Sequence, residues 1–275
     1  MGSEMCIRDS IKGDLNDVVT NNSPIDIDKL IEGTNEILSA NRNSLQLFDM
    51  LHSMRQFDDL TYVHSVNVAL IASILGQWLK FSEKDIRILT ISGLLHDIGK
   101  IMIPNEILTK PGKLTVAEYN IMKQHVNFGY EKVKNQNIDI RIKEACLLHH
   151  EKCDGTGYPF GLKSDQIPAV AKIIAIADVY DAMTSARVYR GALCPFEVID
   201  TMYKDAFTKF EPEYILPFLK NVASSYINND VRLSDGRIGK VVLINENALS
   251  LPIVQCEDEF IDLSKTRGLT VSAIL

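Results

Sequence analysis

The chain lacks any uninterrupted apolar run of about 18 residues, the length that a membrane-spanning helix needs. Polar side chains, His64 among them, interrupt its most apolar stretch, residues 63–79. The first ten residues also lack the charged-then-apolar order of a signal peptide, and they lead into no periodic segment. We therefore predict no membrane segment, and we expect residues 1–10 to be a non-native leader.

Cysteines are few, and none form a CxxC pair among the 5 in the chain. An odd number of cysteines without a secretion signal excludes a disulfide framework and indicates reduced thiols, so we expect a cytoplasmic protein. The chain also lacks a basic excess, because 29 Lys and Arg face 36 Asp and Glu to give a net charge of −7. Such a charge argues against duplex nucleic-acid binding, although a local basic pocket can still bind a small anion.

Apolar residues recur at helical spacing from residue 25 to about residue 225. Ser82 with Asp85 and Thr115 with Glu118 resemble capping boxes, which start helices. A loop rich in glycine and proline follows residue 98. The pattern predicts helices over residues 26–41, 45–54, 62–80, 83–96, 115–133, 139–150, 170–185, 195–207 and 211–225.

The pattern of apolar and turn residues changes after residue 228. Residues 231–244 predict two short strands about a Ser-Asp-Gly turn, and residues 251–256 and 259–263 can add further strands. The predicted fold class is therefore an all-α helical bundle with a small C-terminal β appendage. We divide it into an N-terminal helical segment at 11–44, a main helical domain at 45–226 and a β-rich appendage at 227–275.

Histidine and aspartate recur at helix positions and helix ends along the main helical domain. Together they suit mid-row divalent ions, and a carboxylate can bridge two such ions. An Asp buried without a partner costs several kcal/mol, so Asp178 and Asp181 in one apolar helix need a cation or hydrogen-bond donors. A salt bridge, for which Arg187 is available, is the alternative for both. The pattern predicts a dinuclear metal hydrolase with the candidate ligands His64, His96, Asp97, His125, His149, His150 and Asp178.

This ordered set resembles the HD superfamily of metal phosphohydrolases over about residues 45–225. The cluster at 149–159, which runs from His149-His150-Glu151 to Gly157-Tyr158-Pro159, resembles the HD-GYP subfamily. The resemblance implies an HD-type bundle, with residues 45–226 as the catalytic domain, that hydrolyses the bacterial second messenger cyclic di-GMP. The implied product is linear pGpG, which can be cleaved further to GMP.

The resemblance also implies two divalent metal ions, iron or manganese, and attack by a metal-bridging hydroxide. It makes Asp97 the bridging catalytic carboxylate. It assigns His64, His96 and Asp178 to one ion, and His125, His149 and His150 to the other.

Further residues take roles from the same resemblance. Lys100 should contact a phosphate during catalysis, and Arg187 and Arg190 should add positive charge around the nucleotide. Tyr158 should shape a loop beside the pocket. Asp154 and Asp181 should orient ligand histidines through the second ring nitrogen.

One departure from the family pattern is Leu60, four residues before His64. Some family members carry a Glu there that helps to hold a third metal ion, so we predict a two-metal site and a weaker second cleavage to GMP in this chain.

Three alternatives stay open. The substrate can be another nucleotide, including a different cyclic dinucleotide, or the protein can be a metal-bearing receptor with little turnover. The β appendage can be an interaction module, although we expect it to pack as a structural addition. A homodimer or a signalling-protein partner is compatible with the sequence.

Overall fold

The computed structural model describes residues 13, 16–21, 23–40, 60–185 and 193–275 of the chain. The chain divides into two compact units, Met1–Ala182, here the helical unit, and Met183–Leu275, here the C-terminal unit. None of the described helices is long and apolar enough to cross a membrane.

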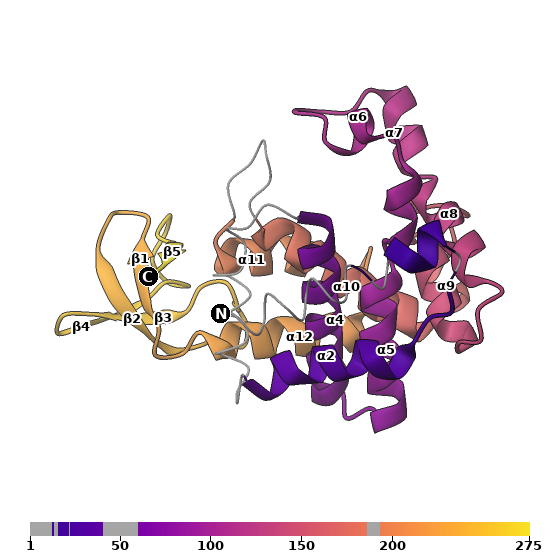
Figure 1. Cartoon of the computed structure of the whole chain (residues 1–275). Coiled ribbons are helices and arrows are strands. Elements are labelled where there is room, and N and C mark those ends of the chain that lie inside the picture. The colour runs from indigo at the N-terminus through magenta and orange to yellow at the C-terminus, as the bar shows by residue number, and fades with distance from the viewer. Residues whose placement is uncertain (1–12, 14–15, 22, 41–59, 186–192) are drawn as a thin grey trace. The chain divides into compact units, whose positions relative to one another are not determined.

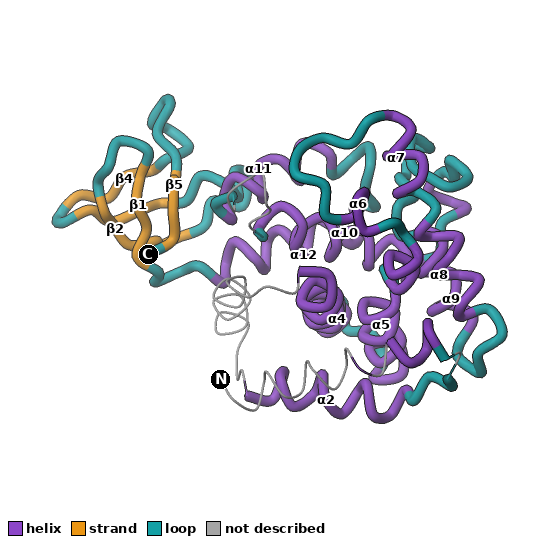
Figure 2. Tube along the Cα trace, turned by 45° about the horizontal axis from the view of Figure 1, so that its top comes forward, coloured by secondary structure: helices purple, strands orange, loops and turns teal. Residues whose placement is uncertain are grey.

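The helical unit is built around long apolar helices that lie side by side. Helix α4 packs along α5, α5 also packs on α9, and α8 packs on both α9 and the 3-10 helix η2 (Figures 1 and 2). Residues of α4 and α10 are apolar around most of the helix surface, which is typical of buried helices. In chain order the described elements are α2 (Ile27–Ala40), α4 (Leu60–Trp78), α5 (Glu83–Leu95), η2 (Ile98–Met102), α6 (Asn105–Leu108), α7 (Val116–Met122), α8 (His125–Val133), α9 (Ile140–Leu148), η3 (Ser164–Gln166) and α10 (Ala169–Thr184).

The predicted helix starts at Ser82 and Thr115 are confirmed. The Ser82 hydroxyl accepts from the Asp85 backbone N–H, and Thr115 forms both bonds of a capping box with Glu118. The first backbone N–H groups of a helix have no acceptor within the helix, and each cap supplies one. These residues therefore fix where α5 and α7 begin.

The single helix predicted over residues 115–133 is wrong, because the segment forms two helices, α7 and α8. At the break the Gln124 backbone N–H donates to the Ile121 carbonyl at 2.9 Å, which closes a tight turn between residues three positions apart. Such a turn barely changes the spacing of apolar residues, so the sequence pattern did not reveal the break. The loop predicted after residue 98 contains η2 and α6. The helix expected over residues 45–54 lies outside the described residues.

Glycine 99 allows η2 to approach α8 with almost no space between the two backbones. A Cβ at Gly99 would lie 2.0 Å from the His125 carbonyl oxygen and 2.4 Å from the Gly129 nitrogen. Only glycine fits such an approach. The contact therefore fixes the turn that follows His96 and Asp97 against the helix that begins with His125.

The C-terminal unit combines α11 (Pro195–Asp205) and α12 (Pro212–Ser225) with a five-stranded antiparallel sheet of order β4-β3-β2-β1-β5. The predicted strands are confirmed as β1 (Asp230–Leu233), β2 (Ile238–Leu243), β3 (Ile253–Cys256) and β4 (Glu259–Asp262). The sequence did not predict β5 (Val271–Ile274), which pairs with β1.

The compact units do not coincide with the segments drawn from the sequence. Helices α11 and α12, which the sequence grouped with the main domain at 45–226, belong to the same unit as the sheet. The physical reason is that α11 packs on α12 and on β5.

Candidate metal centre

Five helices of the helical unit bring the seven candidate ligands together. His64 lies in the second turn of α4, and Asp178 lies in α10. The other ligands stand at helix ends, where the chain turns and side chains of neighbouring residues can diverge: His96 and Asp97 follow α5, His125 begins α8, and His149 and His150 follow α9.

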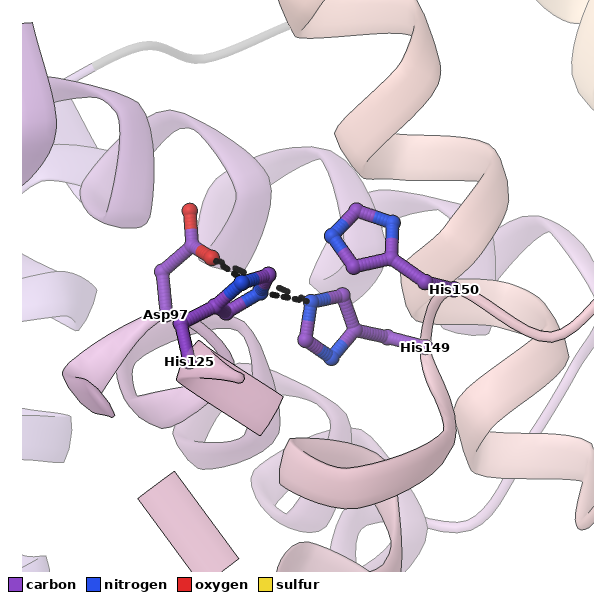
Figure 3. Close-up of side chains that lie close together, drawn as sticks. All are labelled: Asp97, His125, His149 and His150. Carbon is purple, nitrogen blue, oxygen red and sulfur yellow. Dashed lines mark hydrogen bonds and ion pairs between the residues drawn. The ribbon is translucent and has the colours of Figure 1, made fainter. Parts of the chain in front are cut away.

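The seven side chains form two groups, and the ligand atoms of each group lie within 4.8 Å of one another. Figure 3 shows the first group, in which the three imidazoles and the carboxylate converge. The first group contains Asp97, His125, His149 and His150, and the second contains His64, His96 and Asp178.

The Asp97 carboxylate lies between the two groups. Its Oδ1 is 3.3 Å from His125 Nε2 and 3.8 Å from His149 Nε2. Its Oδ2 is 3.2 Å from His96 Nε2 and 3.5 Å from His64 Nε2. The side chain is buried. Each carboxylate oxygen therefore faces a different set of imidazoles.

Four of the histidine rings are held by their Nδ1 atoms. The Nδ1 atoms of His96, His125 and His149 lie 2.7 Å, 2.8 Å and 3.0 Å from the backbone carbonyl oxygens of the residues three or four positions earlier. A carbonyl oxygen only accepts, so each Nδ1 must donate and carry the ring proton. The Nε2 lone pairs of these rings are consequently directed at the cluster.

His64 is oriented by a carboxylate. Its Nδ1 is 2.7 Å from Asp181 Oδ2, and the Asn67 amide donates to Asp181 Oδ1 at 2.9 Å. Asp181 is buried, as is Asn67. The expected contact between Asp181 and a ligand histidine is therefore present, whereas Asn67 was missed. Its position three residues after His64, on the same helix face, is a signal that could have found it.

The electrostatics of Asp97 and of three of the histidines favour the protonation states of metal ligands. Burial would raise the pKa of Asp97, but His96 and Lys100 outweigh it and hold that pKa well below its ordinary value. Burial lowers the pKa of His150 to about 3, and burial also lowers the pKa of His149 and His125. At neutral pH the carboxylate is charged and these three imidazoles are neutral, as metal binding requires.

Two buried atoms of the cluster test whether divalent ions fit. His96 Nε2 and Asp97 Oδ1 are buried and have no hydrogen-bond partner among the described residues. An unsatisfied buried carboxylate oxygen is costly unless a cation or a donor meets it. Nitrogen and carboxylate donors without thiolates suit mid-row divalent ions, so the residues fit the ions that the sequence predicted.

Lys100 and Tyr158 border the cluster. The Lys100 ammonium lies 2.5 Å from Asp97 Oδ2, and its side chain is partly exposed. The Tyr158 ring stacks on the His150 ring, with centroids 4.7 Å apart and 26° between the planes. Both residues therefore lie at the edge of the candidate metal centre, and their roles towards the substrate stay predictions.

Glu151 holds the loop that carries Tyr158. Its buried carboxylate accepts from three backbone N–H groups, those of Phe160, Gly161 and Leu162, at 2.7–3.2 Å. Glu151 belongs to the motif at 149–159, although the sequence predicted no role for it. The position of Glu151 inside this motif is the signal that could have identified it.

The remaining predicted residues have different outcomes. The Asp154 carboxylate accepts from the Thr156 backbone N–H and hydroxyl, which places it in the turn of the same loop. An orienting role for Asp154 stays a prediction. Arg187 and Arg190 lie outside the described residues.

Comparisons with known proteins agree with this geometry. The HD domain family profile matches residues 34–214. The chain is 37% identical over 203 residues to a protein of Pseudomonas aeruginosa named cyclic di-GMP phosphodiesterase PA4108, covering 74% of this chain and 49% of that protein. It is 37% identical over 173 residues to 3'3'-cGAMP-specific phosphodiesterase 1 of Vibrio cholerae, covering 62% of this chain and 38% of that protein. The chain thus spans about half or less of the length of these relatives.

A solved structure supports the fold. The HDG"Y"P protein Bd1817 of Bdellovibrio bacteriovorus superposes with a TM-score of 0.60, at 21% identity, over 77% of this chain and 69% of that chain.

Proposed function

The chain belongs to the HD domain family, and on that premise we propose that it is a metal-dependent phosphodiesterase that hydrolyses cyclic di-GMP to linear pGpG. The observation that carries the proposal is the Asp97 carboxylate, whose two oxygens face two separate groups of ligands. A carboxylate so placed suits two divalent ions, which we propose to be iron or manganese.

We propose that Asp97 is shared between the ions. His64, His96 and Asp178 would hold one, and His125, His149 and His150 the other. When bound, such a pair supplies Lewis acidity and lowers the pKa of water. The Nδ1 hydrogen bonds of His96 and His125 keep the ring proton away from the cluster.

Lys100 is the residue that we propose to bind the phosphate. Its ammonium lies beside Asp97 and is partly exposed, so it can reach a non-bridging phosphoryl oxygen and offset the charge that grows there. Arg187 and Arg190 would add positive charge around the nucleotide. The catalytic segment 45–226, the homodimer and the signalling-protein partner stay predictions.

The first test is chromatography of cyclic di-GMP after incubation with protein loaded anaerobically with iron or manganese, with metal content measured on the same sample. We expect conversion to pGpG at about two metal ions per chain, and loss of both metal and turnover in Asp97→Ala. Full metal loading without turnover of cyclic di-GMP would refute the proposal and favour the metal-bearing receptor.

A second candidate is favoured by the Vibrio cholerae relative, whose name specifies 3'3'-cGAMP. A panel of cyclic di-GMP, 3'3'-cGAMP and cyclic di-AMP separates the candidates. A kcat/KM highest for 3'3'-cGAMP would replace our proposed substrate while leaving the reaction class unchanged.

A further inference from the structure

An aromatic layer extends outward from the candidate metal centre. Tyr158 stacks on His150, and the Tyr119 ring of α7 meets Tyr158 edge to face, with centroids 6.5 Å apart and 80° between the planes. Tyr119 is 48% exposed, although its ring is large and apolar. The layer therefore leads from a ligand histidine to an open aromatic face.

Lys123 places a positive charge beside this layer. Its Nζ lies 5.3 Å from the Tyr119 ring centroid and 6.0 Å from that of Tyr158, within range of cation–π attraction for both rings. No ion pair between described residues includes Lys123, whereas Lys110 pairs with Glu118 and Lys134 pairs with Glu131. In a chain of net charge −7, a lysine held by aromatic rings instead of an acid is suited to meet an electron-rich group of a ligand.

The chemistry of the purine bases indicates which group that is. A base offers a flat face that stacks on an aromatic ring, and this contact is tolerant of base identity. Guanine presents two acceptors, O6 and N7, on one edge, whereas adenine presents the N7 acceptor beside the N6 amino donor. A lysine ammonium has three donors and no acceptor, so it complements the guanine edge and repels the adenine amino group.

We propose that Tyr119 and Lys123 form a nucleobase subsite next to the metal centre. Tyr119 stacks on the base, and Lys123 donates to guanine O6 and N7, so Lys123 determines a preference for guanine over adenine. The inference rests on the proposed function, because it assigns a base subsite to that reaction. The contact exists in the ground state and the transition state alike, so its loss raises KM and leaves kcat unchanged.

The test compares metal-loaded wild type with Lys123→Met, Lys123→Arg and Lys134→Met. The last variant removes the same charge at the C-terminal end of α8, whereas Lys123 caps the C-terminal end of α7. The substrates are cyclic di-GMP, cyclic di-AMP and the base-free diester bis(p-nitrophenyl) phosphate. We expect Lys123→Met to raise KM for cyclic di-GMP about tenfold and to narrow the guanine preference by a similar factor. Lys123→Arg and Lys134→Met should keep the wild-type KM for cyclic di-GMP and the wild-type guanine preference. The KM for the base-free diester should be the same in all of these variants.

A matched pair of variants tests the stacking surface. Tyr119→Phe keeps the ring and should behave as wild type, whereas Tyr119→Ala should raise KM for cyclic di-GMP and for cyclic di-AMP alike. An unchanged guanine preference in Lys123→Met, or an equal loss on all three substrates, would overturn the inference.

The failure of the proposed function would look different. Wild type would then cleave the base-free diester but not cyclic di-GMP. The subsite is tested in that case by titration with 5'-GMP and 5'-AMP. It stands if Lys123→Met weakens GMP binding about tenfold and AMP binding less, and it falls if both affinities are unchanged.

Discussion

Metal binding should displace a proton from His64, and Asp181 should control how many protons are released. His64 Nε2 lies 3.0 Å from Asp178 Oδ1, and its Nδ1 lies 2.7 Å from Asp181 Oδ2. Burial disfavours the imidazolium, but the hydrogen bonds to these two carboxylates outweigh it and raise the pKa of His64 to about 10.

The size of the effect follows from that pKa. At pH 8 a group with a pKa of about 10 is protonated in all but about one molecule in a hundred. A metal ion needs the Nε2 lone pair, so its binding should release about one proton from His64. His149 and His150, whose pKa values are lowered, are already neutral at this pH and release none.

The variant Asp181→Asn removes one of the two carboxylates and so lowers the pKa of His64. Fewer protons should then be released, and the deficit should be largest at a pH between the lowered pKa of His64 in the variant and its pKa of about 10 in wild type. The raised pKa of His64 also makes the stability of the protein without bound metal depend on pH. Because the folded pKa of His64 exceeds 6.5, this ion pair stabilises fully below pH 6.5, and its contribution is lost as the pH approaches 10.

The assay is isothermal titration of metal-free protein with manganese in two buffers of different ionisation enthalpy, which gives the number of protons released. Asp154→Asn is the matched control, because Asp154 accepts from Thr156 in the loop and the substitution should not change the release. Equal proton release by wild type and Asp181→Asn, or none from wild type at pH 8, would refute the reasoning.

Four further predictions concern other parts of the chain. Gly99→Ala should lower the free energy of unfolding by about 2–3 kcal/mol, because its Cβ would overlap the backbone of α8; urea unfolding measures this. Glu151→Gln weakens a carboxylate that accepts three backbone N–H bonds, and should cost about 1.5–3 kcal/mol by the same assay while raising KM for cyclic di-GMP. The Lys110 hydrogen bond lowers the pKa of Glu118 to about 2, so stability from this pair is present above pH 4.5 and lost as the pH falls towards 2. Glu118→Gln should remove that dependence, measured as the midpoint of urea unfolding against pH. Leu60→Glu should raise the metal content from about two towards about three ions per chain, measured by elemental analysis.

Gly13→Ala is the control for Gly99, since nothing lies within 4 Å of a Cβ there, and a loss as large as that of Gly99→Ala would contradict the backbone argument. Glu106→Gln on exposed α6 is the control for Glu118, and an identical pH profile of the two variants would argue against the Lys110 pair. An unchanged metal content in Leu60→Glu would show that this position does not control the number of ions.

The sequence by itself determined the helix starts and the His and Asp residues that the fold brings together as candidate ligands. Ser82 and Thr115 form their caps through residues three positions away, so the interaction is visible in the local sequence. The ordered recurrence of His and Asp was likewise visible, because few chemistries need these residue types together at helix ends. The strands from β1 to β4 were predictable from short-range alternation and turn residues for the same reason.

Tertiary structure decided what depends on contacts between distant residues. The break between α7 and α8 leaves the apolar spacing almost intact, and β5 is defined by its pairing with β1, some 40 residues earlier in the chain. The grouping of α11 and α12 with the sheet depends on packing against β5.

In the candidate metal centre, too, some features are visible in the sequence and others depend on tertiary structure. The sequence named Asp97, but only the fold shows that its two oxygens face different histidines. Asn67 behind Asp181, and Lys123 between two tyrosine rings, are ordinary residues until the helices are packed. The physical reason is that side-chain chemistry is local to a residue, whereas orientation, burial and partner choice arise only when segments far apart in the chain meet.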